Sequence, residues 1–373
     1  MLLTKMKQLR HIGILVIAVM FFISGCDIKN NDVLPNQTFT KIYDDNRFEE
    51  EFYPVDIIQT ADKGYLVLSE RKIEGSIFTG VYVLKTDENG AVISATAMDD
   101  DFVRPVKKLI ASEGMYYFVC MSSLNQVVQL VPIDEQGVIG TPTPVPGTTY
   151  PLVMNADGNN FVMQSYNSVD KRTVVSVFNK AGQVSQLEEF DIGAGEDVEV
   201  HIIDHLTRNG PQLPFQIGKT TTGYYFNGYF NYTFSLVFTD LSDSDPQGVC
   251  QGQQNLGGIG AVQPAGANQF AISRFNFGDN YLSPTANIPT NAVTSSVDLP
   301  GNTFPELEQD AMVVIEPAPN SSDWLYASTT KSNRVVLLGF SQTDGTIKGT
   351  FYLGAYNPYR VSSVTFTEDG GLA

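Results

Sequence analysis

Two histidines four residues apart, His201 and His205, are the side chains in this sequence best suited to metal chemistry. On a helical turn, this spacing places both imidazoles on one face, where Glu199 or Asp204 could add a carboxylate. Zinc needs at least three protein ligands, and no third ligand is evident. The alternative is a solvated insertion that carries two histidines without a metal. We therefore expect no metal site at these histidines. We also expect no catalytic residue and no cofactor elsewhere in the chain.

A second segment, residues 240–245, is rich in carboxylate and hydroxyl oxygens, the ligands that calcium prefers. It lacks the glycine and the terminal bidentate glutamate of the helix–loop–helix calcium loop. The sequence therefore favours a solvated turn over a calcium site.

The densest run of aromatic residues covers positions 224–234. Aromatic rings at alternating positions of a strand can form a platform for sugar rings, or they can pack between sheets. We expect packing, because it is the more common use of alternating aromatic residues. Cys120 and Cys250 fall in strands of different repeat units, so we expect both to be unpaired.

The balance of charge excludes one class of partner. The chain has 23 basic and 41 acidic residues, a net charge of −18, and only 17% of its 373 residues are charged. Such an acidic chain repels phosphate backbones, so nucleic acid is not expected as a partner. Three cysteines do not make a disulfide scaffold.

The N-terminus has the features of an export signal. Lys5, Lys7 and Arg10 precede an apolar run that ends in Ile23-Ser24-Gly25-Cys26. This segment resembles the signal peptide and lipobox of bacterial lipoproteins, and the resemblance implies cleavage before Cys26 and acylation of its thiol. We therefore expect residues 1–25 to be a signal peptide and residues 26–37 a lipidated tether. Residues 1–25 hold three of the basic residues and no acidic one, so the remainder has a net charge of −21.

From residue 38 to residue 373, the sequence repeats a pattern of two linked hairpins. Units begin near residues 55, 106, 151, 214, 260, 311 and 361, and Asp/Asn-x-x-Gly turns such as Asp87-Glu88-Asn89-Gly90 separate the strands. Four strands in units of about 40 to 50 residues are typical of the blades of a β-propeller. The predicted fold class is all-β, with seven blades of which the last is incomplete. A ring of six blades is the alternative, and no helix is expected after the signal peptide.

The seventh unit stops at Ala373 inside its second strand, so we expect a truncated C-terminal blade. In a closed ring, residues 38–43 would supply the outer strand of that blade and bring the two ends of the domain together.

The repeats resemble the degenerate propeller repeats of lipoproteins from the Bacteroidota. Asp62-Lys63-Gly64-Tyr65 and Asp369-Gly370-Gly371 carry the likeness. The resemblance implies a lipid-anchored protein of the outer membrane, on its periplasmic or cell-surface face.

Two classes of function remain. The first is a non-catalytic binding or scaffolding module that contacts an envelope protein or a glycan. The second is a glycoside hydrolase or polysaccharide lyase, which would need carboxylates converging on the central channel. Asp56 is the only acid at the equivalent inner-strand positions, which are otherwise Lys107 or Lys108, Val153, Gln216, Val262, Val313 and Ser363. The binding module is therefore the favoured interpretation.

The first testable prediction is acylation at Cys26. Cells that express the protein should incorporate labelled palmitate into it, and Cys26→Ala should abolish the labelling because the thiol that accepts the lipid is gone. Labelling that survives in Cys26→Ala would show that the lipobox interpretation is wrong.

Overall fold

The computed structural model describes residues 41–43, 51–193, 196–210, 212–254, 256–309, 311–319, 321–354 and 358–373. The chain divides into two units, Met1–Asn46 and Arg47–Ala373. In the first unit only residues 41–43 are described, and they form no strand. Cys26, the predicted signal peptide and tether, and residues 38–40 of the predicted closing strand lie outside the described residues. Across the described ranges, no helix is long and apolar enough to cross a membrane.

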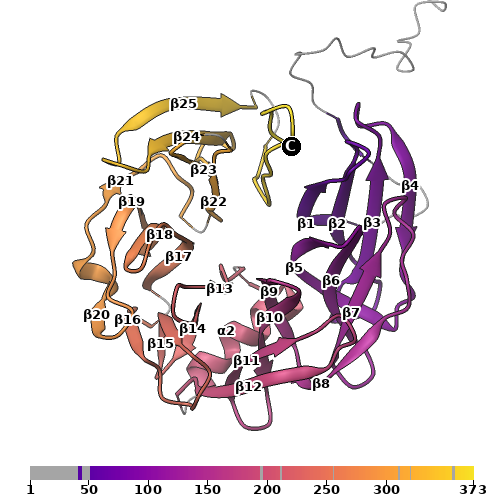
Figure 1. Ribbon diagram of the computed structural model, residues 1–373, viewed down its shortest axis with the longest axis horizontal. Coiled ribbons are helices and arrows are strands. Elements are labelled where there is room, and N and C mark those ends of the chain that lie inside the picture. The colour runs from indigo at the N-terminus through magenta and orange to yellow at the C-terminus, as the bar shows by residue number, and fades with distance from the viewer. Residues whose placement is uncertain are drawn as a thin grey trace, which may run out of the picture. The chain divides into compact units, whose positions relative to one another are not determined.

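The second unit consists of antiparallel sheets in which consecutive strands pair (Figure 1). The first two groups are joined into one sheet by a single bridge between Gly80 and Val103. Their strands are β1 (Phe52–Gln59), β2 (Tyr65–Arg71), β3 (Gly80–Thr86), β4 (Val92–Ala97), β5 (Phe102–Ser112), β6 (Met115–Ser122), β7 (Val127–Ile133) and β8 (Thr143–Thr149).

The next two groups lie on either side of a helix. They comprise β9 (Pro151–Asp157), β10 (Asn160–Asn167), β11 (Arg172–Phe178) and β12 (Val184–Asp191), then α2 (Glu196–Thr207), β13 (Gln216–Lys219), β14 (Tyr224–Phe230), β15 (Thr233–Thr239) and β16 (Gly248–Gln251).

The last two groups complete the set. They contain β17 (Gly257–Pro264), β18 (Gln269–Asn276), β19 (Asp279–Asn287) and β21 (Asn302–Thr303), followed by β22 (Val314–Pro317), β23 (Asp323–Thr329), β24 (Val335–Ser341) and β25 (Ile347–Leu353). Between β19 and β21, β20 (Val293–Ser295) pairs in parallel with β16, and η1 (Ser296–Asp298) is a short 3-10 helix.

The described residues thus form six four-stranded groups, arranged radially with β1, β5, β9, β13, β17 and β22 innermost (Figure 1). The predicted unit starts from residue 55 to residue 311 fall in these inner strands or within three residues of them. The predicted all-β architecture of repeated hairpin pairs is confirmed.

The predicted turns have the expected chemistry. The side-chain oxygen Oδ1 of Asp87 accepts hydrogen bonds from the backbone amides of Asn89 and Ala91, and Gly90 has a φ of 74°. Asp134 and Asn179 make the same pair of bonds in the next two groups. In each case, an Asp or Asn side chain and a glycine in the left-handed region form the turn between the third and fourth strands of the group.

The C-terminal segment lies between the sixth group and the first. Ser363 donates a hydrogen bond to Asp56 in β1, and the amide of Val361 donates to Thr329 in β23. The segment contains one bridge, Phe366 to Leu372, and no strand among the described residues. It occupies the place expected for a seventh unit without forming a four-stranded sheet, so the count of seven blades stays a prediction.

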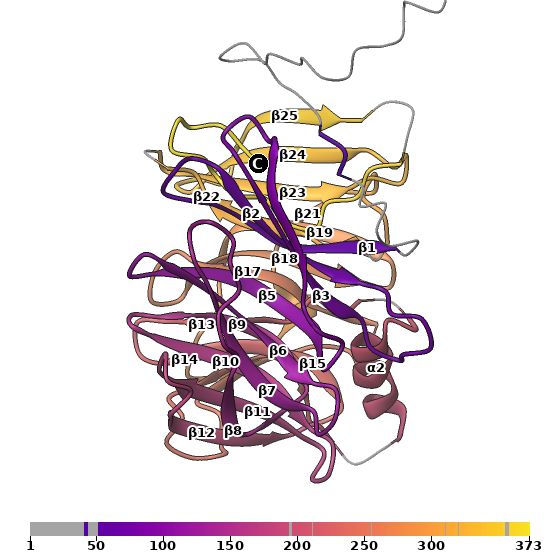
Figure 2. The same ribbon diagram turned by 90° about the vertical axis from the view of Figure 1, so that its right-hand side faces the viewer.

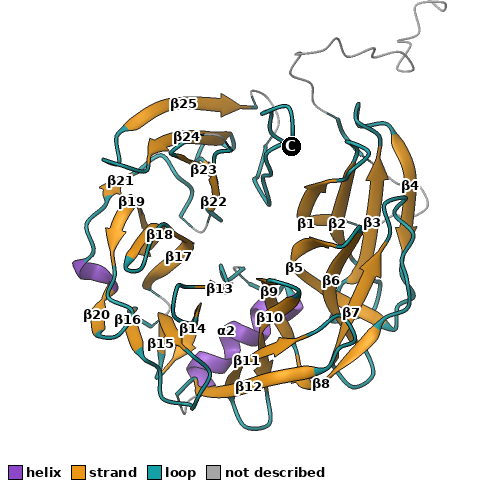
Figure 3. Cartoon of the chain, in the orientation of Figure 1, coloured by secondary structure: helices purple, strands orange, loops and turns teal. Residues whose placement is uncertain are grey.

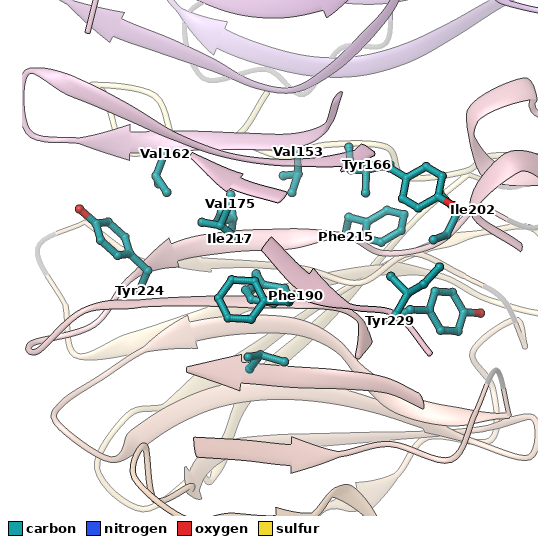
Figure 4. Packing of buried hydrophobic residues seen from close by; sticks show 14 of the residues in the cluster. Val153, Val162, Tyr166, Val175, Phe190, Ile202, Phe215, Ile217, Tyr224 and Tyr229 are labelled. Atoms are coloured by element: carbon teal, nitrogen blue, oxygen red, sulfur yellow. The ribbon is translucent and has the colours of Figure 1, made fainter. Parts of the chain in front are cut away.

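The expectation of no helix after the signal peptide was wrong, because α2 follows β12 (Figure 3). Val198, Ile202 and Leu206 recur every four residues and are buried against the third and fourth groups. Figure 4 shows Ile202 beside Tyr166, Phe215 and Tyr229 in this core. The helical period was present in the sequence, but it covers only three turns.

A buried carboxylate connects α2 to the first two groups. Glu70, at the end of β2, is fully buried and pairs with Arg104 from β5 through one oxygen and with Arg208 through the other. A β-bulge in β5, where Arg104 has a φ of 57°, directs this side chain away from the strand. The guanidinium of Arg208 also stacks on the ring of Tyr53, 4.4 Å from its centroid. The residues after α2 are thereby fixed to the first and second groups.

We predict that Glu70→Gln lowers the free energy of unfolding by about 3 kcal/mol, since it leaves two guanidinium groups without their buried partner. The matched control is Glu308→Gln, which removes a surface ion pair with the exposed Arg360 and should cost less than about 1 kcal/mol. Urea unfolding of the three proteins measures both values. Equal midpoints for Glu70→Gln and the control would contradict the stabilising role of the cluster.

Candidate functional site

The two ends of the strands define two faces of the second unit. Because neighbouring strands are antiparallel, the turns after the second strand of each group and the connections between groups lie at one end. We call this end the helix face, because it carries α2 (Figure 2). The turns after the first and third strands lie on the opposite face.

A cavity of about 570 Å³ opens at the helix face. It lies between α2 and the fourth, fifth and sixth groups, and its lining is mostly aromatic and aliphatic. The lining residues are His201, Asp204, Gln212, Leu213, Pro214, Tyr229, Phe234, Leu256, Gly260, Ser273, Arg274, Phe275, Phe277, Gly278, Asn280, Gln309, Ala311, Met312 and Val313. Cavities of this size and composition are typical of small-molecule sites.

A glycine keeps one wall of the cavity open. Gly260 sits at a β-bulge in β17, and a Cβ atom there would lie 3.2 Å from Ser273 Oγ, 3.7 Å from Pro214 Cγ and 3.8 Å from Phe275 Cδ1. All three neighbours line the cavity. A side chain at this position would therefore extend among the lining residues and reduce the space for a ligand.

Aromatic packing holds the deeper wall. The ring of Tyr229 lies parallel to that of His201, with centroids 6.2 Å apart, and meets Phe234 edge to face at 5.5 Å. The Tyr229 hydroxyl is buried and has no hydrogen-bond partner among the described residues. Burial also raises the pKa of Tyr229, so this hydroxyl keeps its proton and can donate to a ligand.

The two predicted metal-binding histidines have different surroundings. His201 lines the cavity with Asp204, whereas His205 is buried between Arg104 Nη2, at 2.8 Å, and the amide of Leu213, which donates to Nδ1 at 3.0 Å. Burial, Arg104 and Arg208 hold the pKa of His205 well below its usual value. The described residues include no group of three His, Cys, Asp or Glu side chains that could hold a metal ion. The interpretation of this segment as a solvated insertion was also wrong, because it is a packed helix.

The other residues singled out in the sequence have structural roles. Asp240 Oδ1 accepts the amide of Ser242, and Asp240 Oδ2 accepts the side-chain amide of Gln247, as expected for a turn. The aromatic run packs between sheets as predicted, with most of its rings buried in two cores. Cys120 and Cys250 are free and buried.

Charged side chains of the inner strands gather near the centre. Asp56 accepts the amide of Leu109 at 2.7 Å as well as the hydroxyl of Ser363. Lys108 Nζ lies 3.9 Å from a carboxylate oxygen of Glu316 in β22. Burial raises the pKa of Glu316, Lys108 lowers it, and Asp56 raises it again.

Glu316 was missed by the sequence comparison of inner-strand positions. That comparison assigned Val313 to this place, but β22 begins at Val314 and Val313 packs in the core between sheets. Val153 and Val262 are buried in similar cores. Asp56, Lys107, Lys108 and Glu316 thus bring two carboxylates and two lysines together near the centre, one acid more than expected.

No known protein family matches the sequence, and no curated protein does. Several solved structures are similar to this chain in fold. One, described as the structure of the Dos1 propeller, has a TM-score of 0.50 and 10% identity, over 86% of this chain and 75% of that chain. This chain is a β-propeller.

Further matches are more distant. A chain of a mitotic checkpoint complex matches with a TM-score of 0.47 and 12% identity, over 92% of this chain and 94% of that chain. A protein of unknown function from Bacteroides caccae matches with a TM-score of 0.31 and 12% identity, over 52% of this chain and 65% of that chain. With TM-scores below 0.5, neither match carries an inference about this chain.

The geometry of the propeller suits non-covalent binding at the helix face. The cavity combines aromatic rings with the amides of Gln212, Asn280 and Gln309 and the carboxylate of Asp204. Such side chains hold a ligand through apolar contact and hydrogen bonds. No short motif marks this cavity, because its walls come from α2 and three different blades.

The low pKa of His205 predicts a loss of stability in acid. Because the unfolded state takes up a proton near pH 6.5 and the folded state does not, the free energy of unfolding should fall below that pH by up to about 1.4 kcal/mol per unit. His205→Asn keeps an acceptor for the Leu213 amide but cannot titrate. The difference in free energy of unfolding between the wild type and this variant should therefore shrink from pH 7 to pH 5.

His201→Asn, which removes the other imidazole of α2, is the comparison variant over the same range. Urea unfolding at each pH provides the measurement. If the difference in free energy of unfolding between the wild type and His205→Asn does not change with pH, His205 is not a buried neutral imidazole.

Proposed function

We propose that this protein is a lipid-anchored β-propeller of the cell envelope that binds a small, largely apolar ligand without chemical conversion. The cavity at the helix face is the observation that carries this proposal. Its aromatic and aliphatic lining favours the burial of apolar ligand surface, which is the main source of affinity for small molecules.

The polar groups of the cavity suggest an amphipathic ligand. Asp204 contributes a carboxylate, and three amide side chains contribute both donors and acceptors. The buried Tyr229 hydroxyl is left without a protein partner among the described residues, which costs free energy unless a ligand or water accepts its proton. A ligand with an apolar body and a hydrogen-bond acceptor at one end fits these groups.

The proposed location rests on the N-terminal sequence. The lipobox at Cys26 supports an acyl anchor, and two or more acyl chains provide stable attachment to a membrane. The likeness of the repeats to lipoproteins of the Bacteroidota supports the outer membrane, on its periplasmic or cell-surface face. An envelope protein or a glycan at the same membrane is the proposed further partner.

The fourth prediction concerns the Gly260 wall. The neutral fluorescent probe N-phenyl-1-naphthylamine should bind the wild type with one saturable site, and Gly260→Val should weaken binding at least tenfold by filling the cavity. Gly349→Val is the matched control, since a Cβ at Gly349 meets no atom within 4 Å, and its binding should equal that of the wild type.

Ala311→Leu, at another lining position, provides a second test should Gly260→Val unfold. Probe titration by fluorescence measures affinity, and urea unfolding checks that each variant is folded. Unchanged affinity in both folded variants would show that the cavity is not the binding site.

A glycoside hydrolase or polysaccharide lyase is the second candidate. One observation favours it: burial raises the pKa of Glu316, which lies near a second carboxyl group, Asp56, as expected of a general acid. Against it, both oxygens of Asp56 accept hydrogen bonds within the protein. Release of reducing ends or unsaturated products from envelope glycans, lost in Glu316→Gln, would favour this candidate over the binding module.

A further inference from the structure

Exposed apolar side chains stand at the tips of turns on the helix face. Of the six turns that follow the second strand of a blade, five carry one, and each belongs to a different blade. They are Leu124, Val169, Ile77, Phe277 and Tyr232, with 89%, 86%, 68%, 66% and 48% of their surface exposed. The sixth turn, residues 330–334, carries none. We call these five residues the tip residues.

The opposite face lacks this pattern. Among the described residues of the six turns that follow the first strand of each blade, none is a large apolar residue that is exposed. In the connections that follow the third strand, the described exposed apolar residues are Val138, Val293 and Val297, and they come from only two blades. The two faces are built from the same repeats, so the difference does not follow from composition alone.

Two tip residues also occupy unfavourable backbone conformations. Tyr232 has a φ of 71° and Phe277 a φ of 48°, in two-residue turns where asparagine and glycine are preferred. Bulky residues are uncommon in the left-handed region, and about half of Tyr232 and two thirds of Phe277 remain exposed there. Retaining them is a cost to folding that contact with another surface could offset.

We propose that the helix face contacts a lipid surface and that the tip residues enter its interfacial layer. The blades are arranged around a ring (Figure 1), and equivalent turns of antiparallel blades end at the same face, so the five turns that carry the tip residues are distributed over the helix face. A bilayer is a plane and can receive all five at once.

A protein partner fits this arrangement less well. Protein interfaces have a contiguous apolar centre, whereas the tip residues are separated by polar positions and belong to different blades. The immediate neighbours of Leu124 and Tyr232 are uncharged, whereas Val169 is followed by Asp170. Uncharged polar groups can remain at the depth of lipid headgroups while the apolar tips enter.

The charge of the protein indicates which lipids it contacts. The connection between the first two blades exposes Asp99, Asp100 and Asp101 on the helix face, and the chain as a whole is strongly acidic. Anionic lipids repel such a face, so the expected surface is zwitterionic. Phe277 and Leu256 belong both to this face and to the rim of the cavity, which therefore opens toward the proposed lipid surface.

The test uses residues 26–373 with Cys26→Ser, which cannot be acylated, and unilamellar vesicles of phosphatidylcholine. In flotation, the protein should bind these vesicles, and it should bind vesicles containing phosphatidylglycerol less. Changing Leu124, Val169 and Phe277 together to Ser should reduce binding at least tenfold, because apolar surface is lost. The matched control changes Val138, Ile347 and Phe351, exposed elsewhere, to Ser and should leave binding unchanged.

A second measurement avoids reliance on the triple variant. Phe277→Trp keeps an aromatic ring at the tip, and its fluorescence should be quenched by brominated phosphatidylcholine, whereas Val138→Trp should not respond. The native Trp324 is buried and serves as the common background. Absence of vesicle binding, equal loss in the matched control, or unquenched Phe277→Trp in bound protein would overturn the proposal and leave the helix face as a surface for a protein partner.

Discussion

The fully buried carboxylate of Glu70 is the constraint on which the helix face depends. An ionised carboxylate without water is stable only when it is paired, and Arg104 and Arg208 each pair with one of its oxygens. Arg104 is fixed by a bulge in β5, and Arg208 follows α2 directly. The ion cluster therefore ties the helix between the third and fourth blades to the first and second blades, and α2 in turn forms a wall of the cavity.

Neighbouring residues on one face of α2 have different roles. His205 contacts the ion cluster, where burial and two arginines keep the imidazole neutral. His201 and Asp204 line the cavity. The four-residue spacing that suggested a shared metal thus connects a stabilising cluster with a ligand site, and any movement of the helix would alter both.

Features that depend on local sequence could be predicted. The turn at Asp87 closes through its own side chain and a glycine four residues into the turn, so the hairpins and their repeat follow from a few neighbouring residues. Features that join distant residues could not. Glu70 meets partners 34 and 138 positions away, and the cavity takes its walls from three blades and α2. Glu316 escaped notice because the assumed strand register was wrong by a few residues. It placed Val313 at the inner-strand position, whereas Val313 packs in the core and Glu316 lies in β22.

The central claim is that the Glu70 cluster holds α2 in place and thereby maintains the cavity at the helix face. Amide hydrogen exchange of α2 in Arg208→Ala tests this claim most directly, with β10 of the adjacent blade as the internal reference. The account predicts that exchange in α2 becomes at least tenfold faster while β10 stays protected, because only the local attachment of the helix is lost. Unchanged protection of α2 in Arg208→Ala would contradict it.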